Sequence, residues 1–467
     1  MIFEMNSWFK TDNKISFQLK QLKSLFYLSN NIYMRRLTFF ALLFLTQICR
    51  GQDAVTFNKD IGPLIQAKCS YCHKPGEAAP FNLLSYEDVA KRAKFIAKVV
   101  QSKYMPPWKA DDHYTHFANN RSLSKDEIKR IMDWVKSGAP KGNQPDYKIT
   151  VLENTSFNRK PDLTLKVKDG YEVPGDNKER FIVYKIPFEL PQEYNVEAVE
   201  FFSNNKKIIH HANYAVHAVD DSIDIYKTAS MINLTDDDRT KYAQYFPYKK
   251  SITYYGGWIP GTSYEKYPEN FGWIMPKRGV ILLTVHYSPL AKEAFSVAGI
   301  NLFFTKTPVK RKIKVISLGS GGIGAKDIVP EFHYIPANKI SSYKLEIVNP
   351  RENESVFYVW PHMHLLGKSF KAYAVFGNND TIPLVNIPEW DFRWQEIYRF
   401  KKPVLIPMGS KLVIEATYDN TSANPFNPND PPKVVTSEGD MRSDQEMMTL
   451  LMLYVPYEDG DENISLE

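Results

Sequence analysis

Three features are scarce in this sequence, and each absence excludes something. Only three of the 467 residues are cysteine, the formal net charge is only +6, and no segment after residue 50 approaches the ~20 apolar residues that span a membrane. We therefore expect no transmembrane domain in the mature chain. Basic residues do not cluster with interleaved aromatics, so we also expect no nucleic-acid partner. The 43% hydrophobic content indicates buried cores instead, and the length suits about three domains of ~150 residues each.

The N-terminus has the pattern of an export signal. Arg35 and Arg36 precede an apolar run of about 12 residues, 37–48, a usual length for the apolar region of a signal peptide. Met34 is then the expected start of translation, with cleavage near residue 51. Cys49 allows a lipoprotein anchor, and an uncleaved membrane anchor is the other alternative. In each case we expect the remainder to be exported, to the periplasm or the extracellular space.

Export leaves Cys69 and Cys72 needing another role, because two cysteines so close in sequence make a poor structural disulfide. The run Cys69-Ser-Tyr-Cys72-His73 has the spacing at which two thioethers hold a haem and the histidine ligates its iron. A thioredoxin-like redox pair is the alternative, disfavoured by His73, by export and by the lack of a preceding strand. The expected cofactor is one covalently attached c-type haem.

A sixth iron ligand should follow at some distance from this motif. Met105 is the expected ligand, because Pro106 and Pro107 would hold its loop rigidly extended against the porphyrin. His113 and His116 are rivals for this position. Methionine ligation raises the haem potential relative to bis-histidine ligation, which suits an electron carrier.

The rest of the chain divides by its sequence pattern. Residues 54–140 read as helical, with helix starts at Ser85 and Ser124 and a stop at Gly138, and 141–160 reads as a polar linker. Beyond it, runs rich in branched and aromatic residues favour two antiparallel β-sandwiches divided near 318–328. The expected strands are 181–188, 196–202, 280–287, 299–304, 343–348, 411–418 and 449–456. The expected organisation is an extension that is non-native or unstructured (1–33), a signal peptide (34–51), a cytochrome c-like haem domain (54–140), a linker (141–160) and two β-sandwich domains (161–318 and 328–460).

One motif in the dividing segment is misleading. Gly319-Ser-Gly321-Gly-Ile-Gly324 formally matches the dinucleotide-binding fingerprint. That fingerprint works only where a helix follows and aims its N-terminus at the pyrophosphate. Here Pro330 follows within six residues of Gly324 and no βαβ unit surrounds the motif, so we interpret it as a flexible turn.

A pair of histidines late in the chain is spaced as metal ligands are. His362 and His364 lie two apart in a strand-like run, so strand alternation puts both rings on one face. Imidazole suits copper and zinc, and a thioether such as that of Met447 selects for Cu(I). Two histidines and a methionine therefore suggest a copper site.

An earlier pair is less simple to interpret. His210 and His211 are adjacent, so they point to opposite faces of a regular strand and share a metal only at a strand end, bulge or turn. One buried structural histidine beside an exposed one is the alternative. His286 lies in a clear strand and could supply a third nitrogen, whereas His217 lies too far along an extended strand to share the site.

These residues resemble the copper type II, ascorbate-dependent monooxygenases, the family of peptidylglycine α-hydroxylating monooxygenase and dopamine β-hydroxylase. The resemblance covers about 180–460. Its most specific match is the element His362-Met-His364-Leu-Leu-Gly-Lys368. Three shorter elements accompany it in the family's order: Ile209-His210-His211, Val285-His286-Tyr287 and Glu446-Met447.

The resemblance implies two jelly-roll β-sandwiches with one copper ion each, facing a cleft. It implies an electron-delivering copper on three histidines and an O₂-binding, catalytic copper on two histidines and a methionine. The implied reaction activates O₂ and inserts one oxygen atom into a substrate C–H bond. The implied partners are O₂, a small-molecule substrate and an electron donor, either an ascorbate-like reductant or a redox protein. The implied ligands are His210, His211 and His286 for the first copper, and His362, His364 and Met447 for the second.

The sequence also departs from the family. The β region has no cysteine, whereas eukaryotic members are stapled by disulfides. Gln445 stands where the family's D-E-M element has Asp, so Met448 remains a rival of Met447. Trp360 and Leu451 stand where peptide-hydroxylating members carry the Arg and Tyr that help clamp the substrate carboxylate. We therefore expect an apolar or aromatic small molecule as substrate rather than a peptide C-terminus.

We hypothesise that the haem domain supplies electrons to the copper ions within the same chain. Two other classes of protein stay open. One is a non-enzymatic electron-transfer or copper-handling protein on the same scaffold. The other is a carbohydrate-binding module that uses exposed aromatics, although core packing is the commoner fate of such residues. The aromatics concerned are Trp258, Trp273, Trp390 and Trp394.

Overall fold

The computed structural model describes residues 54–150, 157–235, 239–349, 352–437 and 444–467. The expected extension and signal segment, 1–51, lie outside these residues, as does 151–156 of the expected linker. From Phe57 onward the chain forms one compact unit, Phe57–Glu467. No helix in the described part of the chain combines the length and the apolar character needed to cross a membrane.

The α-helices lie near the start of the described chain, and their caps explain their bounds. Ser85 accepts from the backbone N–H of Asp88 at 3.1 Å, and Ser124 forms a complete capping box with Glu127, so both expected helix starts are confirmed. The helix expected from Ser85 is interrupted at residues 91–92 and becomes two. Gly138, with φ +88°, follows the last helix as predicted. The elements are a single π turn η1 (Phe57–Ile61), α2 (Gly62–Lys68), α3 (Tyr86–Ala90), α4 (Ala93–Gln101) and α5 (Lys125–Lys136).

The first β part contains two main sheets. Its elements are β1 (Leu163–Lys166), β2 (Tyr171–Val173), β3 (Arg180–Glu189), β4 (Tyr194–Ser203), η2 (Lys206–Ile208), β5 (Ile209–Ala218), β6 (Met231–Asn233), η3 (Arg239–Lys250), β7 (Ile252–Trp258), β8 (Tyr264–Lys266), β9 (Phe271–Met275), β10 (Arg278–Tyr287), β11 (Ala294–Ser296), β12 (Ala298–Phe304) and β13 (Arg311–Lys312). One sheet has the order β1-β12-β4-β9-β13 with β8 paired to β4, and the other has the order β6-β3-β10-β5-β7. Stacked rings join their faces: Phe201 on Trp258 at 5.1 Å, and Tyr254 on Trp273 at 4.6 Å.

The second β part begins where the chain leaves β13. Its elements are β14 (Lys314–Gly319), η4 (Ala325–Asp327), β15 (Tyr334–Ile335), β16 (Lys339–Val348), β17 (Glu354–His362), β18 (Gly367–Phe376), β19 (Asp380–Ile387), β20 (Tyr398–Ile406), β21 (Lys411–Asn420), β22 (Val435–Thr436), β23 (Thr449–Pro456) and η5 (Asp461–Asn463). Its two four-stranded sheets have the orders β14-β23-β17-β20 and β16-β21-β18-β19. Because β13 pairs with β9 while β14 pairs with β23, the chain passes from one part to the other at Ile313.

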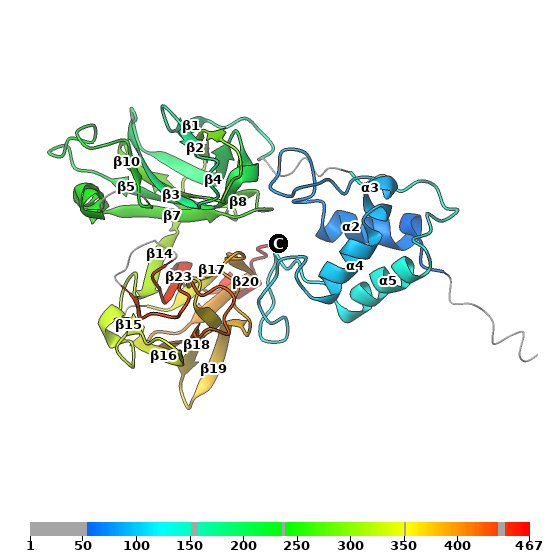
Figure 1. The fold of residues 1–467 in the computed structure, drawn as a ribbon. Helices are drawn as coiled ribbons and strands as arrows, with labels where there is room; N and C mark the ends of the chain where they lie inside the picture. The colour runs from blue at the N-terminus through cyan, green and yellow to red at the C-terminus, as the bar shows by residue number, and fades with distance from the viewer. Residues whose placement is uncertain (1–53, 151–156, 236–238, 350–351, 438–443) are drawn as a thin grey trace, which may run out of the picture. The chain divides into compact units, whose positions relative to one another are not determined.

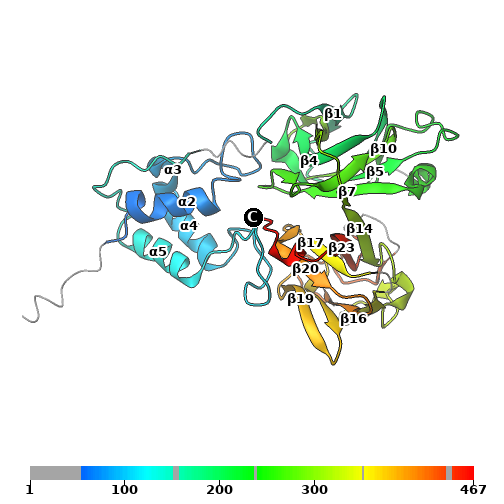
Figure 2. The same ribbon diagram turned by 180° about the vertical axis from the view of Figure 1, so that it is seen from behind.

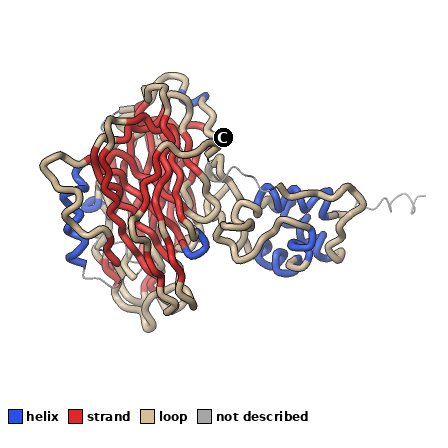
Figure 3. Tube along the Cα trace, turned by 90° about the horizontal axis from the view of Figure 1, so that it is seen from above, coloured by secondary structure: helices blue, strands red, loops and turns tan. Residues whose placement is uncertain are grey.

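The body is therefore mostly antiparallel β-sheet with few helices (Figures 1 and 2). Figure 3, coloured by secondary structure, shows how much of the chain is strand. All seven expected strands are confirmed, as parts of β3, β4, β10, β12, β16, β21 and β23. The central strand β10 is buried along nearly its whole length. It lies between β3 and β5 within the sheet, so neither of its edges is open to solvent.

A long segment without regular structure connects α4 and α5, and we call residues 104–121 the arm. The arm packs on the second β part: the N–H of Asp111 donates to the Asn386 carbonyl at 2.8 Å, and that of Ala118 to the Arg399 carbonyl at 2.8 Å. Phe117, 2% exposed, lies against Tyr398 with ring centroids 4.9 Å apart. The arm thus shares the hydrophobic core of the β region.

Candidate metal centres

A β-bulge brings two adjacent histidines to one point. In the pairing of β5 with β10, His286 lies opposite His211, and the next pair is Tyr287 with Ile209. His210 is therefore an extra residue without a cross-strand partner, which bends the strand locally and re-aims its side chains. A bulge of this kind is what two adjacent strand residues need if His210 and His211 are to bind the same metal ion.

The three imidazoles of this group converge through the same ring nitrogen. Nδ1 of His210 lies 3.0 Å from Nδ1 of His211 and 3.1 Å from Nδ1 of His286. Nitrogens bound ~2.0 Å from one metal ion lie about 3–3.5 Å apart, so the spacing fits a common ion. We call His210, His211 and His286 the three-histidine group. His217 lies farther along β5 and does not join it.

Neighbouring side chains fix the orientation of His286. Its Nε2–H donates to the Glu179 carboxylate at 2.6 Å, which leaves Nδ1 with its lone pair facing the group. Phe181, directly opposite on β3, stacks on the ring at 4.0 Å. Burial lowers the pKa of all three histidines, and for His211 and His286 the neighbouring imidazoles add to that effect. The three rings are therefore neutral and can donate lone pairs near pH 7.

A second pair of histidines converges at the end of β17. Nε2 of His362 lies 3.1 Å from Nε2 of His364. Nδ1–H of His364 donates to the Gln445 carbonyl at 2.9 Å, so its Nε2 carries the lone pair. Burial lowers the pKa of His362 to about 3, with His364 adding to the effect and a hydrogen bond to Gln395 opposing it. Neutral nitrogens face one point here too.

Packing distinguishes the two candidate methionines. Thr449, the first residue of β23, lies directly opposite His362, so their side chains point to the same face of the sheet. Met447 lies in the segment just before β23, and a side chain at Gly321 would contact both Met447 and Thr449. Met448 is fully buried in the hydrophobic core.

The segment before β23 is held in place by a buried carboxylate. Glu446, 1% exposed, accepts from the backbone N–H of His364 at 2.9 Å and from that of Leu366 at 2.6 Å. Burial raises the pKa of Glu446 to about 8, although these backbone donors oppose the shift. Glu446 therefore ties the methionine segment to the histidine segment.

The glycine-rich turn after β14 also supports this site. The N–H of Ser320 donates to the Met448 carbonyl at 2.8 Å, and Ser320 Oγ accepts from the N–H of Met448 at 2.9 Å. Only the short η4 follows, so the helix that the dinucleotide fingerprint needs is absent from this described segment. The segment is thus a turn, as expected, but not the flexible one that the sequence suggested, because these hydrogen bonds hold it against the Met447 segment.

The Cys-x-x-Cys-His motif follows the end of α2. Nδ1–H of His73 donates to the Phe81 carbonyl at 2.9 Å, which leaves Nε2 available to an iron atom. Burial raises the pKa of Cys69 to about 12 and also raises that of Cys72, the opposite of the lowered pKa that a thiol–disulfide redox pair needs. Cys72 contacts Gly261, and a cavity of about 270 Å³ opens beside Tyr71 of the motif. These features fit a thioether-linked haem.

The three candidate sixth ligands differ in exposure. Met105, in the arm just after α4, is half-buried, whereas His113 and His116 are exposed. An axial ligand must reach a buried iron atom, so the burial of Met105 suits that role better.

Sequence reasoning missed the side chains that support these groups. Glu179 precedes the strand that pairs with β10, but that pairing is a long-range feature and has no local signal. Phe392 and Gln395 lie in a loop rich in aromatic and charged residues, and this composition was the available signal.

The four tryptophans considered for carbohydrate binding are not exposed. Trp390 and Trp394 are half-buried, and Trp258 and Trp273 are each 1% exposed in the core. These four tryptophans offer no exposed platform for a carbohydrate.

Two neighbouring groups of imidazoles on a β-sheet body are candidate sites for a borderline metal ion such as copper or zinc. Comparison with known proteins narrows this choice. Residues 315–457, which include His362, His364 and Met447, match the family model described as "Copper type II ascorbate-dependent monooxygenase, C-terminal domain". The chain is also similar to MOXD1 homolog 2 of Drosophila melanogaster, with 23% identity over 216 residues, which are 43% of this chain and 26% of that protein. The chain thus spans about a quarter of the length of the curated relative that it matches.

Solved structures give only remote similarity. The structure of allantoicase has 9% identity and a TM-score of 0.17, covering 54% of this chain and 83% of that chain. The structure of infectious bursal disease virus Gx strain has 11% identity and a TM-score of 0.14, covering 66% of this chain and 75% of that chain. Scores this low do not establish a shared fold.

Proposed function

We propose that this protein is an exported copper-dependent monooxygenase that hydroxylates a C–H bond of a small non-peptide molecule. The observation that carries the proposal is the convergence of two histidine groups, through Nδ1 in one and Nε2 in the other, in a chain whose second β part matches the copper monooxygenase family. In this proposal the three-histidine group holds an electron-delivering copper. His362, His364 and Met447 hold the copper at which O₂ is activated.

The protein's contribution would be to hold and shield these ligands. A copper ion bound there supplies one-electron redox chemistry and an open position for O₂. Glu179 and the Gln445 carbonyl fix the tautomers of His286 and His364, so each presents a lone pair without rearrangement. A thioether favours the reduced ion, which is the form that reacts with O₂.

The further parts of the proposal follow from the family resemblance, from the Cys-x-x-Cys-His motif and from the export signal. The two β parts would be jelly rolls, and the helical part with the arm would be a cytochrome c-like domain that holds a haem on Cys69, Cys72, His73 and Met105. Electrons would enter from an ascorbate-like reductant or a redox protein, pass through the haem and reach the copper sites. The chain would act in the periplasm or outside the cell.

The substrate class is indicated by two residues near His362. Trp360 lies two residues before His362 on β17 and directly opposite Leu451 on β23. Its indole, 4% exposed, packs on Gly257 and lies 5.9 Å from the ring of Tyr255. Neither Trp360 nor Leu451 carries a charge that could bind a carboxylate, so an apolar or aromatic small molecule suits these two positions.

A glycine-extended peptide should accordingly fail as a substrate. Mass spectrometry after incubation with copper-loaded protein, O₂ and reductant is expected to show no hydroxylated product above that of a copper-free control. Small aromatic molecules supplied at the same concentration form the comparison set. Hydroxylation of the peptide at a rate matching the best of them would contradict the assignment.

The test of the function itself starts with metal content. Mature protein made with cytochrome c maturation and reconstituted with copper should contain one haem and two copper ions per chain. His362→Ala should lose one copper and keep the haem. His333→Ala is the matched control, because His333 is an exposed histidine of the same β part with 69% of its side chain accessible, and it should keep both copper ions.

The outcome separates three cases. Full metal content with substrate-dependent O₂ consumption supports the monooxygenase. Full metal content without such consumption on any substrate favours an electron-transfer or copper-handling protein on this scaffold. Haem without tightly bound copper would overturn the enzyme proposal.

A further inference from the structure

One loop of the second β part contacts both histidine groups. It joins β19 to β20, and we call residues 388–397 the bridging loop. The ring of Phe392, 8% exposed, has its centroid 5.9 Å from His210, 6.0 Å from His286 and 5.7 Å from His364. A single side chain thus lies beside histidines of both groups.

The bridging loop also contacts His362, through Gln395. The side-chain amide of Gln395 hydrogen-bonds the His362 imidazole. Its Nε2 donates to the Phe392 carbonyl at 3.0 Å, which leaves its amide oxygen to accept from His362. Gln395 is 3% exposed, so this contact is fixed by packing.

The outer side of the bridging loop holds the arm. The ring of Trp394 meets that of Tyr104 edge-on with centroids 6.3 Å apart, and the Arg393 guanidinium lies 5.2 Å over the Tyr104 ring. Glu396 pairs with Arg121, and Asn119 donates to the Ile397 carbonyl at 2.7 Å.

Further along the loop, Lys109 lies 3.6 Å from Asp391. Aromatic, ionic and backbone contacts therefore join the arm to residues 391–397 of the loop.

These contacts and the covalent bonds between neighbouring residues form a continuous path from Met105 to His362. Tyr104 directly precedes Met105, the proposed haem ligand, and touches Trp394. Trp394 is covalently joined to Gln395, which contacts His362. Electron tunnelling through protein is fastest along covalent bonds, hydrogen bonds and closely packed rings. We propose that the bridging loop conducts electrons from the haem to the His362 copper through Tyr104, Trp394 and Gln395.

This inference rests on the proposed function, since it takes a haem iron and a copper ion as its end points. The step moves one electron: ferrous haem is oxidised to ferric, cupric ion is reduced to cuprous, and no bond to either metal breaks. Phe392 lies on the inner side of the loop against both histidine groups, so the same loop also sets the contact between the two copper sites.

The test measures haem oxidation without oxygen or substrate. In full-length protein loaded with haem and Cu(II), the haem is reduced by a light flash, and its reoxidation is followed by absorbance while the Cu(II) signal is followed by electron paramagnetic resonance. Trp394→Leu should slow reoxidation by about tenfold or more, the scale of loss seen when groups supporting metal ligands are removed. Trp394→Phe should retain most of the rate because it keeps a ring beside Tyr104.

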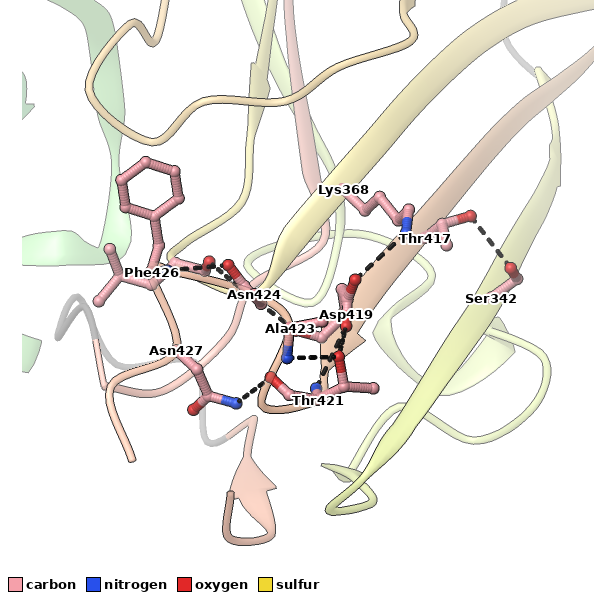
Figure 4. Close-up of polar contacts among 10 residues, drawn as sticks. Ser342, Lys368, Thr417, Asp419, Thr421, Ala423, Asn424, Phe426 and Asn427 are labelled. Carbon is pink, nitrogen blue, oxygen red and sulfur yellow. Dashed lines mark hydrogen bonds and ion pairs between the residues drawn. The ribbon is translucent and has the colours of Figure 1, made fainter. Parts of the chain in front are cut away.

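A matched control lies in the same neighbourhood. The Arg393 guanidinium lies 4.9 Å over the ring of Phe426 as well, but Phe426 is off the proposed route. Phe426 stands on a turn with its own hydrogen bonds, from Thr421 to Asp419 and from the Phe426 N–H to Asn424 at 2.9 Å (Figure 4). Phe426→Leu should leave the rate unchanged.

Two results would overturn the inference in different ways. If Trp394→Leu and Tyr104→Leu, with the metal content of the parent, both reoxidise at the parent's rate, the route is wrong while the proposed function stands. If the parent's haem reoxidises no faster with copper than without, electrons do not pass from haem to copper, and both the route and the proposed electron supply fail. Tyr104, 38% exposed, provides the variant of the route least prone to affect folding.

Discussion

Replacing Met447 with leucine should reduce substrate oxidation by more than the ~10–100-fold lost when an outer-shell partner of a metal site is removed. Leucine fills nearly the same volume but cannot donate a lone pair, so the site would keep two imidazoles and lose its preference for reduced copper. The three-histidine group belongs to the other β part and should keep its copper. Substrate-dependent O₂ consumption, copper content and the midpoint potential of each copper measure these effects.

Met448→Leu is the matched control. Met448 is fully buried in the core, so the exchange is a volume-conserving one that should cost less than about 1.5 kcal/mol and leave oxidation intact. Loss of oxidation in Met448→Leu together with retention in Met447→Leu would reverse the assignment. The two variants test the alternative that the sequence left open, because they make the same exchange at adjacent positions.

Above pH 8, where the Glu446 carboxylate is ionised, Glu446→Gln should both destabilise the fold and weaken copper binding at His362 and His364. The carboxylate accepts from two buried backbone donors, the N–H groups of His364 and Leu366. The amide of glutamine has one acceptor oxygen, so one donor would be left facing an NH₂ group. An unsatisfied buried donor costs about 1–3 kcal/mol, and we expect the free energy of unfolding to fall by this amount. Copper affinity should fall about 10–100-fold, because Glu446 fixes the backbone that carries His364.

Urea unfolding of the copper-free protein and competition with a copper chelator measure the two effects. Glu352→Gln provides the comparison, since Glu352 pairs with Lys314 at 2.6 Å on the surface and such pairs contribute only about 0–1 kcal/mol. Equal unfolding midpoints for the two variants would show that Glu446 does not hold the histidine segment.

Local sequence patterns predicted much of the secondary structure. The Ser124 capping box and the Gly138 stop bound α5, and the run 280–287 became the buried strand β10, because caps and apolar runs act through neighbours in the chain. The helix expected after Ser85 was interrupted, since residues 91–92 turn the chain there.

The histidines and methionine of the candidate sites were predicted from the sequence, by residue type and spacing for His362 and His364 and by family resemblance for the full set. The side chains that contact these histidines were not predicted. Glu179 and Gln395 are distant in sequence from the histidines they contact, and no sequence pattern links them.

By itself the sequence indicated candidate metal ligands and determined which segments form strands. Only the tertiary structure decided how they meet. The bulge at His210 and the pairing of His211 with His286 arise from cross-strand register, and a shift of one residue would turn these rings to the other face. Register also places Thr449, which packs with Met447 around Gly321, directly opposite His362. Register is set by long-range pairing of strands, which is why no local pattern in the sequence could fix it.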